Sequence, residues 1–174
     1  MSNSVHSTSY PKIAALFTRA SSALSYPKLR LHIPPSTNHP EGDSVLLKLA
    51  GTRSAHAGTV TVTNGLPYGD PENLFYGRID SLGSLTLSSY AATQYIPEST
   101  CMLTALAALE TSPTEYALSY AAATCSCMFC GRELLRNTSK LVGYGSICAD
   151  KWGLPYPTEA DVQDSKNSDL LNQL

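Results

Sequence analysis

The sequence predicts an α+β fold in which a small antiparallel sheet of about five strands is combined with several helices. Short apolar segments with turn signals between them follow one another over residues 28–88. A segment with helical spacing of apolar residues precedes them, and an alanine-rich region follows them. Four of the five cysteines then fall within residues 125–148, which predicts a small separate module near the C-terminus.

The composition favours one domain with a real hydrophobic core. The chain has 174 residues, of which 43% are hydrophobic and 15% are charged. The net charge of −2 excludes a protein that binds nucleic acid by overall charge alone. Residues 1–60 and 125–152 are basic (net +4 and +2), whereas residues 61–124 and 153–174 are acidic (net −5 and −3). This distribution allows a polarised surface but does not require one.

The first expected helix runs from about Pro11 to about Leu24, because apolar residues recur there at helical spacing and proline is tolerated in a first turn. A helix of this kind packs on its own sheet more often than on a partner. Residues 1–8 are polar and we expect them to be frayed.

The segment Lys28–Ile33 alternates between polar and apolar residues, which predicts a half-buried strand. Its outward-facing side chains are Lys28, Arg30 and His32. Such a row can bind phosphates, although it is more often only the solvated face of a sheet. Residues 36–42 should form a loop after Pro34–Pro35.

Four further strands are expected over residues 43–50, 59–63, 74–80 and 84–88. Simple alternation places Tyr76 and Arg78 on one face, where an aromatic ring and an arginine could stack on bases. Tyrosine is also simply a good strand former, which is the commoner reason for its presence.

Two alanine-rich helices should follow and pack as a hairpin. The first covers about residues 99–110 and carries Cys101, which we interpret as a core thiol. The second begins at a capping box in which Ser112 caps the helix, Pro113 occupies the first turn and Glu115 reaches back.

The cysteine module has the spacing of a zinc knuckle. Cys127 and Cys130 are separated by two residues, and Gly131 follows, where we expect it to avoid a Cβ that would crowd the turn. Cys148 returns after the Gly143–Gly145 turn and could bind the same Zn²⁺. Trp152 and Leu154 should close the module by packing on it.

The fourth zinc ligand is not determined by the spacing. Cys125 would complete a set of four thiols, although only Ser126 separates it from Cys127. Asp150, Cys101 or a distant histidine are the alternatives. The competing interpretation is a metal-free cluster of buried thiols in a reducing compartment.

These residues resemble a family of small domains of unassigned function, frequent in bacteriophage proteins and also attached to helicase-like proteins. Its pattern is C-x-x-C-G-R-x-L, a serine, then G-[YI]-G-P-x-C. The matching residues are Cys127, Cys130, Gly131, Arg132, Leu134, Ser139, Gly143, Gly145 and Cys148. Ser146 replaces the usual proline, and Cys125 stands where glycine is common. The resemblance implies DNA metabolism, without implying a reaction.

We expect three parts: an α+β body (1–123), the zinc-binding module (124–156) and an acidic, disordered tail (157–174), which includes the start of a brief helix at Thr158. Neither a membrane span nor a signal peptide is evident, so we expect a cytoplasmic protein, in the host if it is a phage product. The sequence says nothing of the oligomeric state.

No catalytic signature is evident: there is no glycine-rich phosphate loop and no G-x-S-x-G, and all four histidines lie in the first third of the chain. We therefore expect a binding protein and not an enzyme.

The first hypothesis is a nucleic-acid-associated module. Its candidate contacts are Arg132, Arg136, Lys140, Lys151, Tyr144, Arg30 and Arg78, with Trp152 as a further stacking group. The alternative is a factor that binds and inhibits or redirects a host enzyme or defence component, which fits the acidic segments better.

Overall fold

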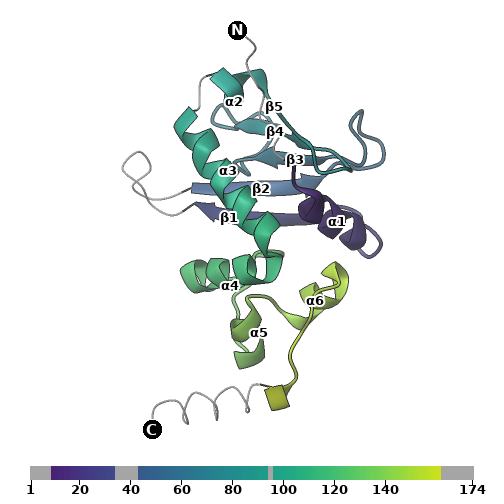
Figure 1. The fold of residues 1–174 in the computed structure, drawn as a ribbon, viewed down its shortest axis with the longest axis vertical. Helices are drawn as coiled ribbons and strands as arrows, with labels where there is room; N and C mark the ends of the chain where they lie inside the picture. The colour runs from purple at the N-terminus through teal and green to yellow at the C-terminus, as the bar shows by residue number, and fades with distance from the viewer. Residues whose placement is uncertain (1–8, 34–42, 94–95, 162–174) are drawn as a thin grey trace.

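The computed structural model describes residues 9–33, 43–93 and 96–161. Its centre is a five-stranded antiparallel sheet in which each strand pairs with its neighbour in sequence (Figure 1). The strands are β1 (Lys28–Ile33), β2 (Asp43–Leu49), β3 (Val60–Thr63), β4 (Phe75–Ile79) and β5 (Leu85–Leu87). Every strand ends within one residue of its predicted bounds, and the α+β class is confirmed.

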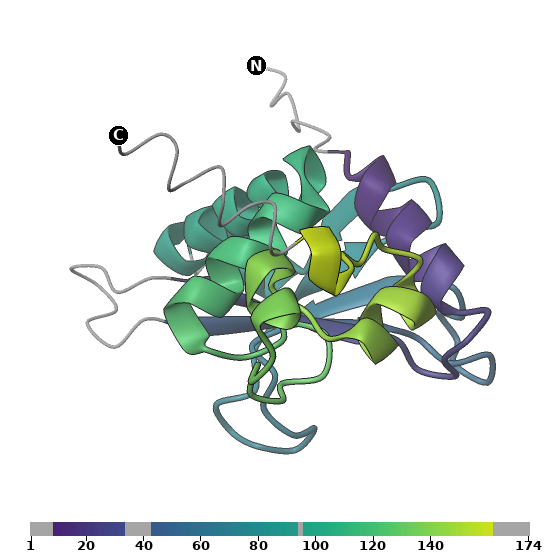
Figure 2. The same ribbon diagram turned by 90° about the horizontal axis from the view of Figure 1, so that it is seen from below.

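The helices among the described residues are α1 (Pro11–Ala20), α2 (Ser89–Thr93), α3 (Ile96–Thr111), α4 (Pro113–Thr124), α5 (Asn137–Val142) and α6 (Ser146–Trp152). Helices α1 and α3 lie on the same side of the sheet (Figure 2). Helices α4, α5 and α6 continue beyond the β1 edge of the sheet (Figure 1). The cysteine module is therefore built against this edge.

Helix α1 ends at Ala20, earlier than the predicted Leu24. The hydroxyl groups of Ser21 and Ser22 donate hydrogen bonds to the carbonyl oxygens of Thr18 and Arg19, at 2.7 and 2.8 Å. These bonds satisfy acceptors of the last turn and so favour its termination. Leu24 still packs against the core from the following turn.

Ser112 caps the N-terminus of α4, as predicted, whereas its own N–H donates to the carbonyl of Ala108 at 3.3 Å. Ser112 has extended backbone, and its side chain accepts a hydrogen bond from the N–H of Glu115, at 3.4 Å. Pro113 occupies the first helical position. Helix α4 follows α3 after this single residue and leads the chain to the cysteines.

The hydrophobic core lies between the sheet and the helices and continues into the cysteine module. From the sheet it takes the inward residues Leu29, Leu31, Ile33, Val45, Leu47, Val60, Val62 and Ile79, all buried. Phe129, Tyr144 and Trp152 from the module belong to the same cluster. The ring of Trp152 contacts Phe17 of α1 edge-on, with a centroid distance of 5.2 Å. The body and the module therefore share one core.

A β-bulge in β4 changes which side chains reach the open side of the sheet. The register between β3 and β4 shifts between Val62 and Thr63, which leaves Tyr76 as an extra residue in β4. Tyr76 turns inward and is 1% exposed. The guanidinium carbon of Arg78 lies 4.5 Å from the ring centroid of Phe75. The prediction that Tyr76 and Arg78 share a face was wrong, because the bulge puts Phe75 in that place.

The predictions for residues 1–8, residues 36–42 and most of the tail fall outside the described residues. The described part of the tail includes the expected helical start. There the N–H and hydroxyl groups of Thr158 donate to a carboxylate oxygen of Asp161, at 2.6 and 2.7 Å.

Candidate metal centre

Three of the four module cysteines lie close together. The Sγ atoms of Cys127, Cys130 and Cys148 are all within 4.8 Å of one another. Thiolates that share a tetrahedral zinc ion are roughly 3.8 Å apart, as follows from Zn–S bonds of about 2.3 Å. Small side-chain movements would therefore suffice, and the three cysteines could hold a metal ion.

The first arm of the site is a tight turn. The N–H of Gly131 donates to the carbonyl of Cys127 at 2.7 Å, and the N–H of Cys127 donates to the carbonyl of Arg132 at 2.9 Å. Gly131 has φ +71°, and no other atom would lie within 4 Å of a Cβ there. The expected crowding is therefore absent, and glycine is favoured by the left-handed backbone conformation.

The second arm is fixed by a close approach to α4. Gly143 ends α5 with φ +82°, and a Cβ at this position would overlap the carbonyl of Ala117. The chain then passes through Gly145 into the first turn of α6, where Cys148 lies. The glycine-rich turn thus brings Cys148 back to the first arm, as predicted.

The environment of Cys127 favours its thiolate. Its pKa is lowered to about 5, first by the hydrogen bond with Cys148 and then by backbone hydrogen bonds from Cys130, Gly145 and Phe129, while burial opposes this shift. For Cys148, the neighbouring Cys127 sulfur and burial raise the pKa. Metal ligation requires thiolates, and converging backbone N–H groups stabilise negative charge. Cys127 is therefore prepared for the role of a ligand.

The structure does not bring Cys125 into this group. Cys125 is exposed and caps the C-terminus of α4 with φ 55°. Asp150 is exposed on α6, and Cys101 packs against the core from α3. Among the described residues, no fourth cysteine, histidine or carboxylate joins the three. A fourth ligand would therefore have to be a water molecule or a group from outside the described residues.

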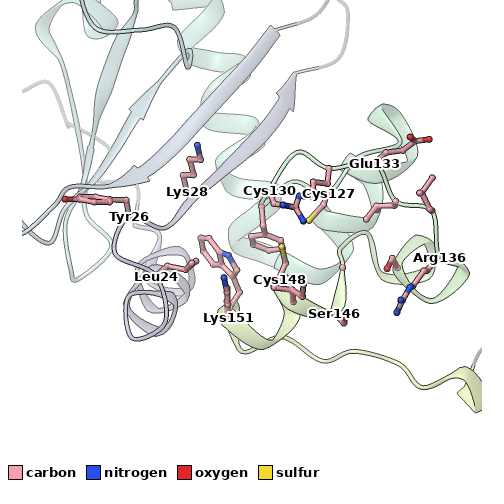
Figure 3. Close-up of a pocket in the computed structure, with 18 residues that line it drawn as sticks. Leu24, Tyr26, Lys28, Cys127, Cys130, Glu133, Arg136, Ser146, Cys148 and Lys151 are labelled. Atoms are coloured by element: carbon pink, nitrogen blue, oxygen red, sulfur yellow. The ribbon is translucent and has the colours of Figure 1, made fainter.

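A cavity of about 600 Å³ opens beside the cysteines, and all three line it (Figure 3). Its wall includes four cationic side chains: Lys28, Arg132, Arg136 and Lys151. Among the described residues that form the wall, Glu133 is the one carboxylate. Lys28 comes from the start of β1, whereas Lys151 comes from α6, so distant segments meet around the cysteines (Figure 3).

Other predicted site residues lie elsewhere. Lys140 is exposed on α5 but does not line the cavity. Arg30 and Arg78 lie on the strands and do not line it. Tyr144 is fully buried, and its hydroxyl donates to the carbonyl of Pro155 at 2.7 Å.

Trp152 is 1% exposed and packs on Phe129, with a centroid distance of 4.6 Å. Its predicted packing on the module is confirmed. The suggested stacking roles of Tyr144 and Trp152 were wrong, because both rings belong to the core.

Sequence reasoning did not place three of the residues that line the cavity. Leu135 and Ile147 line it while remaining 74% and 64% exposed. The two adjacent leucines after the C-x-x-C turn could have indicated an exposed apolar side chain at this site. Leu134 is buried there, so its neighbour Leu135 must face outward. Lys28 was expected only on the outward face of its strand, and its position beside the cysteines gave no signal, because it is 99 positions before Cys127.

Comparison with family models, with curated proteins and with solved structures finds no match for this chain. None of the helices among the described residues is long and apolar enough to span a membrane.

Proposed function

We propose that this protein is a zinc-binding module that acts by binding nucleic acid, with zinc as a structural cross-link and no catalytic role. Thiolate ligands favour zinc over hard cations such as Mg²⁺. A bound ion would tie the turn at Cys127–Cys130 to α6 through Cys148. With the resemblance to a phage-associated family, this proposal places the protein in DNA metabolism.

The observation that carries the proposal is the charge of the cavity wall. The described part of the wall contains four cationic side chains and one carboxylate around the three cysteines. Zinc with three thiolates has a net charge of −1, so compensation of the metal site accounts for only part of the positive charge. The remainder would attract phosphate groups, which dominate nucleic-acid affinity.

The test is fluorescence anisotropy with labelled oligonucleotides over a range of salt concentrations, using the zinc-loaded full chain. We expect the double variant Arg136→Ala/Lys151→Ala to bind at least tenfold more weakly. The slope of log affinity against log salt should fall by about 1.4 for a single strand, from about 0.7 for each lost phosphate contact. Zinc content should not change.

Lys140→Ala is the matched control, because Lys140 is an exposed cation of the same module outside the cavity. Equal losses in the control and the double variant would contradict a specific role for the cavity. An absence of binding by the wild type would contradict the proposal itself.

A second candidate is a protein-interaction factor directed at a host enzyme or defence component. Leu135 and Ile147 favour it, since exposed apolar side chains grouped at a cavity are typical of a protein interface. Leu135→Ser/Ile147→Ser should then abolish capture of a host protein that Arg136→Ala still captures. Under the first proposal, the same leucine and isoleucine changes leave oligonucleotide affinity within twofold of wild type.

A further inference from the structure

The outward face of the sheet is open. Helices and core cover the inward face, whereas none of the outward-facing strand residues among those described is buried. These outward residues are Lys28, Arg30, His32, Ser44, Leu46, Lys48, Thr61, Thr63, Phe75, Arg78 and Thr86. None of them is acidic, and Asp70, Glu72 and Asp80 lie in the loops between strands.

We propose that this open face binds single-stranded nucleic acid. The inference rests on the proposed function for the class of ligand, but it assigns a surface that shares only Lys28 with the described lining of the metal-site cavity. The core and the helices on the other side of the sheet do not contribute to this binding surface.

The cationic side chains on this face do not serve to stabilise the fold. Lys28 of β1 lies directly opposite Lys48 of β2, and the same cross-strand row continues through Thr61 to Arg78. Like charges directly opposite each other destabilise a sheet. Among the described residues, the buried Nε atom of Arg78 has no hydrogen-bond partner. An anionic ligand would supply the missing countercharge.

The cations are combined with aromatic rings. The Arg78 guanidinium lies over the ring of Phe75, and the Lys48 ammonium lies 5.8 Å from the ring centroid of Tyr26. Arg30 reaches across the outward face, since a Cβ on Gly65 would lie 3.4 Å from its Nη1 atom. Cationic groups beside aromatic rings can contact phosphates and stack on bases, which an acidic peptide would not require.

The width of the sheet favours a single strand over insertion into the major groove of a duplex. Five strands spaced about 4.8 Å apart span roughly 19 Å, which exceeds the major-groove width of about 12 Å. The face is therefore too broad to enter a duplex groove, whereas a single strand can lie across it. Tyr26 and Lys28 also line the metal-site cavity, so the two basic surfaces meet at the start of β1 (Figure 3).

The test compares binding of labelled single-stranded and duplex 20-mers to the zinc-loaded full chain. We expect Lys48→Ala/Arg78→Ala to weaken single-strand binding at least tenfold and to lower the salt slope by about 1.4. Thr86→Glu adds a carboxylate at an exposed position of the same row and should also weaken binding. Lys140→Ala should leave binding unchanged, and circular dichroism with zinc content verifies that each variant is folded.

The outcomes separate this inference from the proposed function. If the cavity variant binds weakly while Lys48→Ala/Arg78→Ala and Thr86→Glu bind as wild type, the sheet face is not the binding surface and only this inference is overturned. Tighter binding of duplex than of single strand would also overturn it. If the wild type binds neither form, both proposals are overturned.

Discussion

At the scale of single residues, Lys28 and Lys48 oppose each other across two neighbouring strands. Facing side chains of an antiparallel pair have Cβ atoms about 5 Å apart, so like charges there repel. The nearby Tyr26 ring faces the ammonium of Lys48 but carries no net negative charge. We therefore expect the pair to lower the stability of the free protein.

Replacing Lys48 by glutamate should convert this repulsion into attraction. We expect Lys48→Glu to raise the free energy of unfolding by roughly 0.5 kcal/mol, as measured by urea denaturation. Lys48→Gln, which removes only the repulsion, should give a smaller gain. A loss of stability in Lys48→Glu would contradict this account of the pair. The same variant should also bind oligonucleotides more weakly.

The sequence predicted single residues well where spacing decides their position. Cys127 and Cys130 could be assigned because a two-residue separation brings their side chains together. Tyr144 and Tyr76 could not, since an aromatic residue with a polar group suits both a surface and a core. For Tyr76 the deciding event was the bulge, which is set by strand pairing and not by local pattern.

At the scale of elements, a side-chain hydrogen bond as well as packing attaches α4 to β1. The hydroxyl of Tyr116 donates to the carbonyl of His32, at 3.3 Å. Burial is the largest cause that raises the pKa of Tyr116 to about 12. The folded state therefore favours the neutral phenol.

This attachment predicts a pH dependence. Tyr116 is neutral in both states below its ordinary pKa of about 10, so its contribution is complete there. Between pH 10 and about 12 only the unfolded state ionises, so stability falls as pH rises. Urea denaturation from pH 8 to pH 11 should show a smaller fall in Tyr116→Phe. Tyr68→Phe, at a fully exposed position, is the control; an identical fall in all three proteins would contradict the prediction.

The elements themselves were largely predictable. Alternation fixed the strands because one face of the sheet is buried, and the Ser112–Glu115 cap fixed the start of α4. The end of α1 was not predictable from apolar spacing, since Leu24 continues the helical pattern although the chain has already turned. Serine hydroxyls that compete for the last carbonyls decide it.

At the scale of the whole molecule, the cysteine module is part of the core. The N–H of Arg30 on β1 donates to the carbonyl of Met128 in the first cysteine arm, at 2.8 Å. Arg19 of α1 donates to the carbonyl of Gly153 just after α6, at 2.8 Å. A structural change at the metal centre should therefore also affect α1 and β1.

Removal of the metal tests this connection. We expect a chelator to increase amide hydrogen exchange in residues 125–153 and also in α1, because Trp152 packs on Phe17. Exchange in β3 and β4 should change least, since these strands lie away from the module. An increase confined to residues 125–136 would contradict a shared core. Long-range packing of this kind, between α1 and α6, was not evident in the sequence.

The most direct test of the central claim is the metal content of the purified protein and of two cysteine variants. We predict one zinc ion per chain in the wild type and in Cys125→Ser, because Cys125 lies outside the group of three. Cys148→Ser should lose the metal. Wild-type protein without zinc would contradict the metal centre, and loss of zinc in Cys125→Ser would contradict the three-cysteine site.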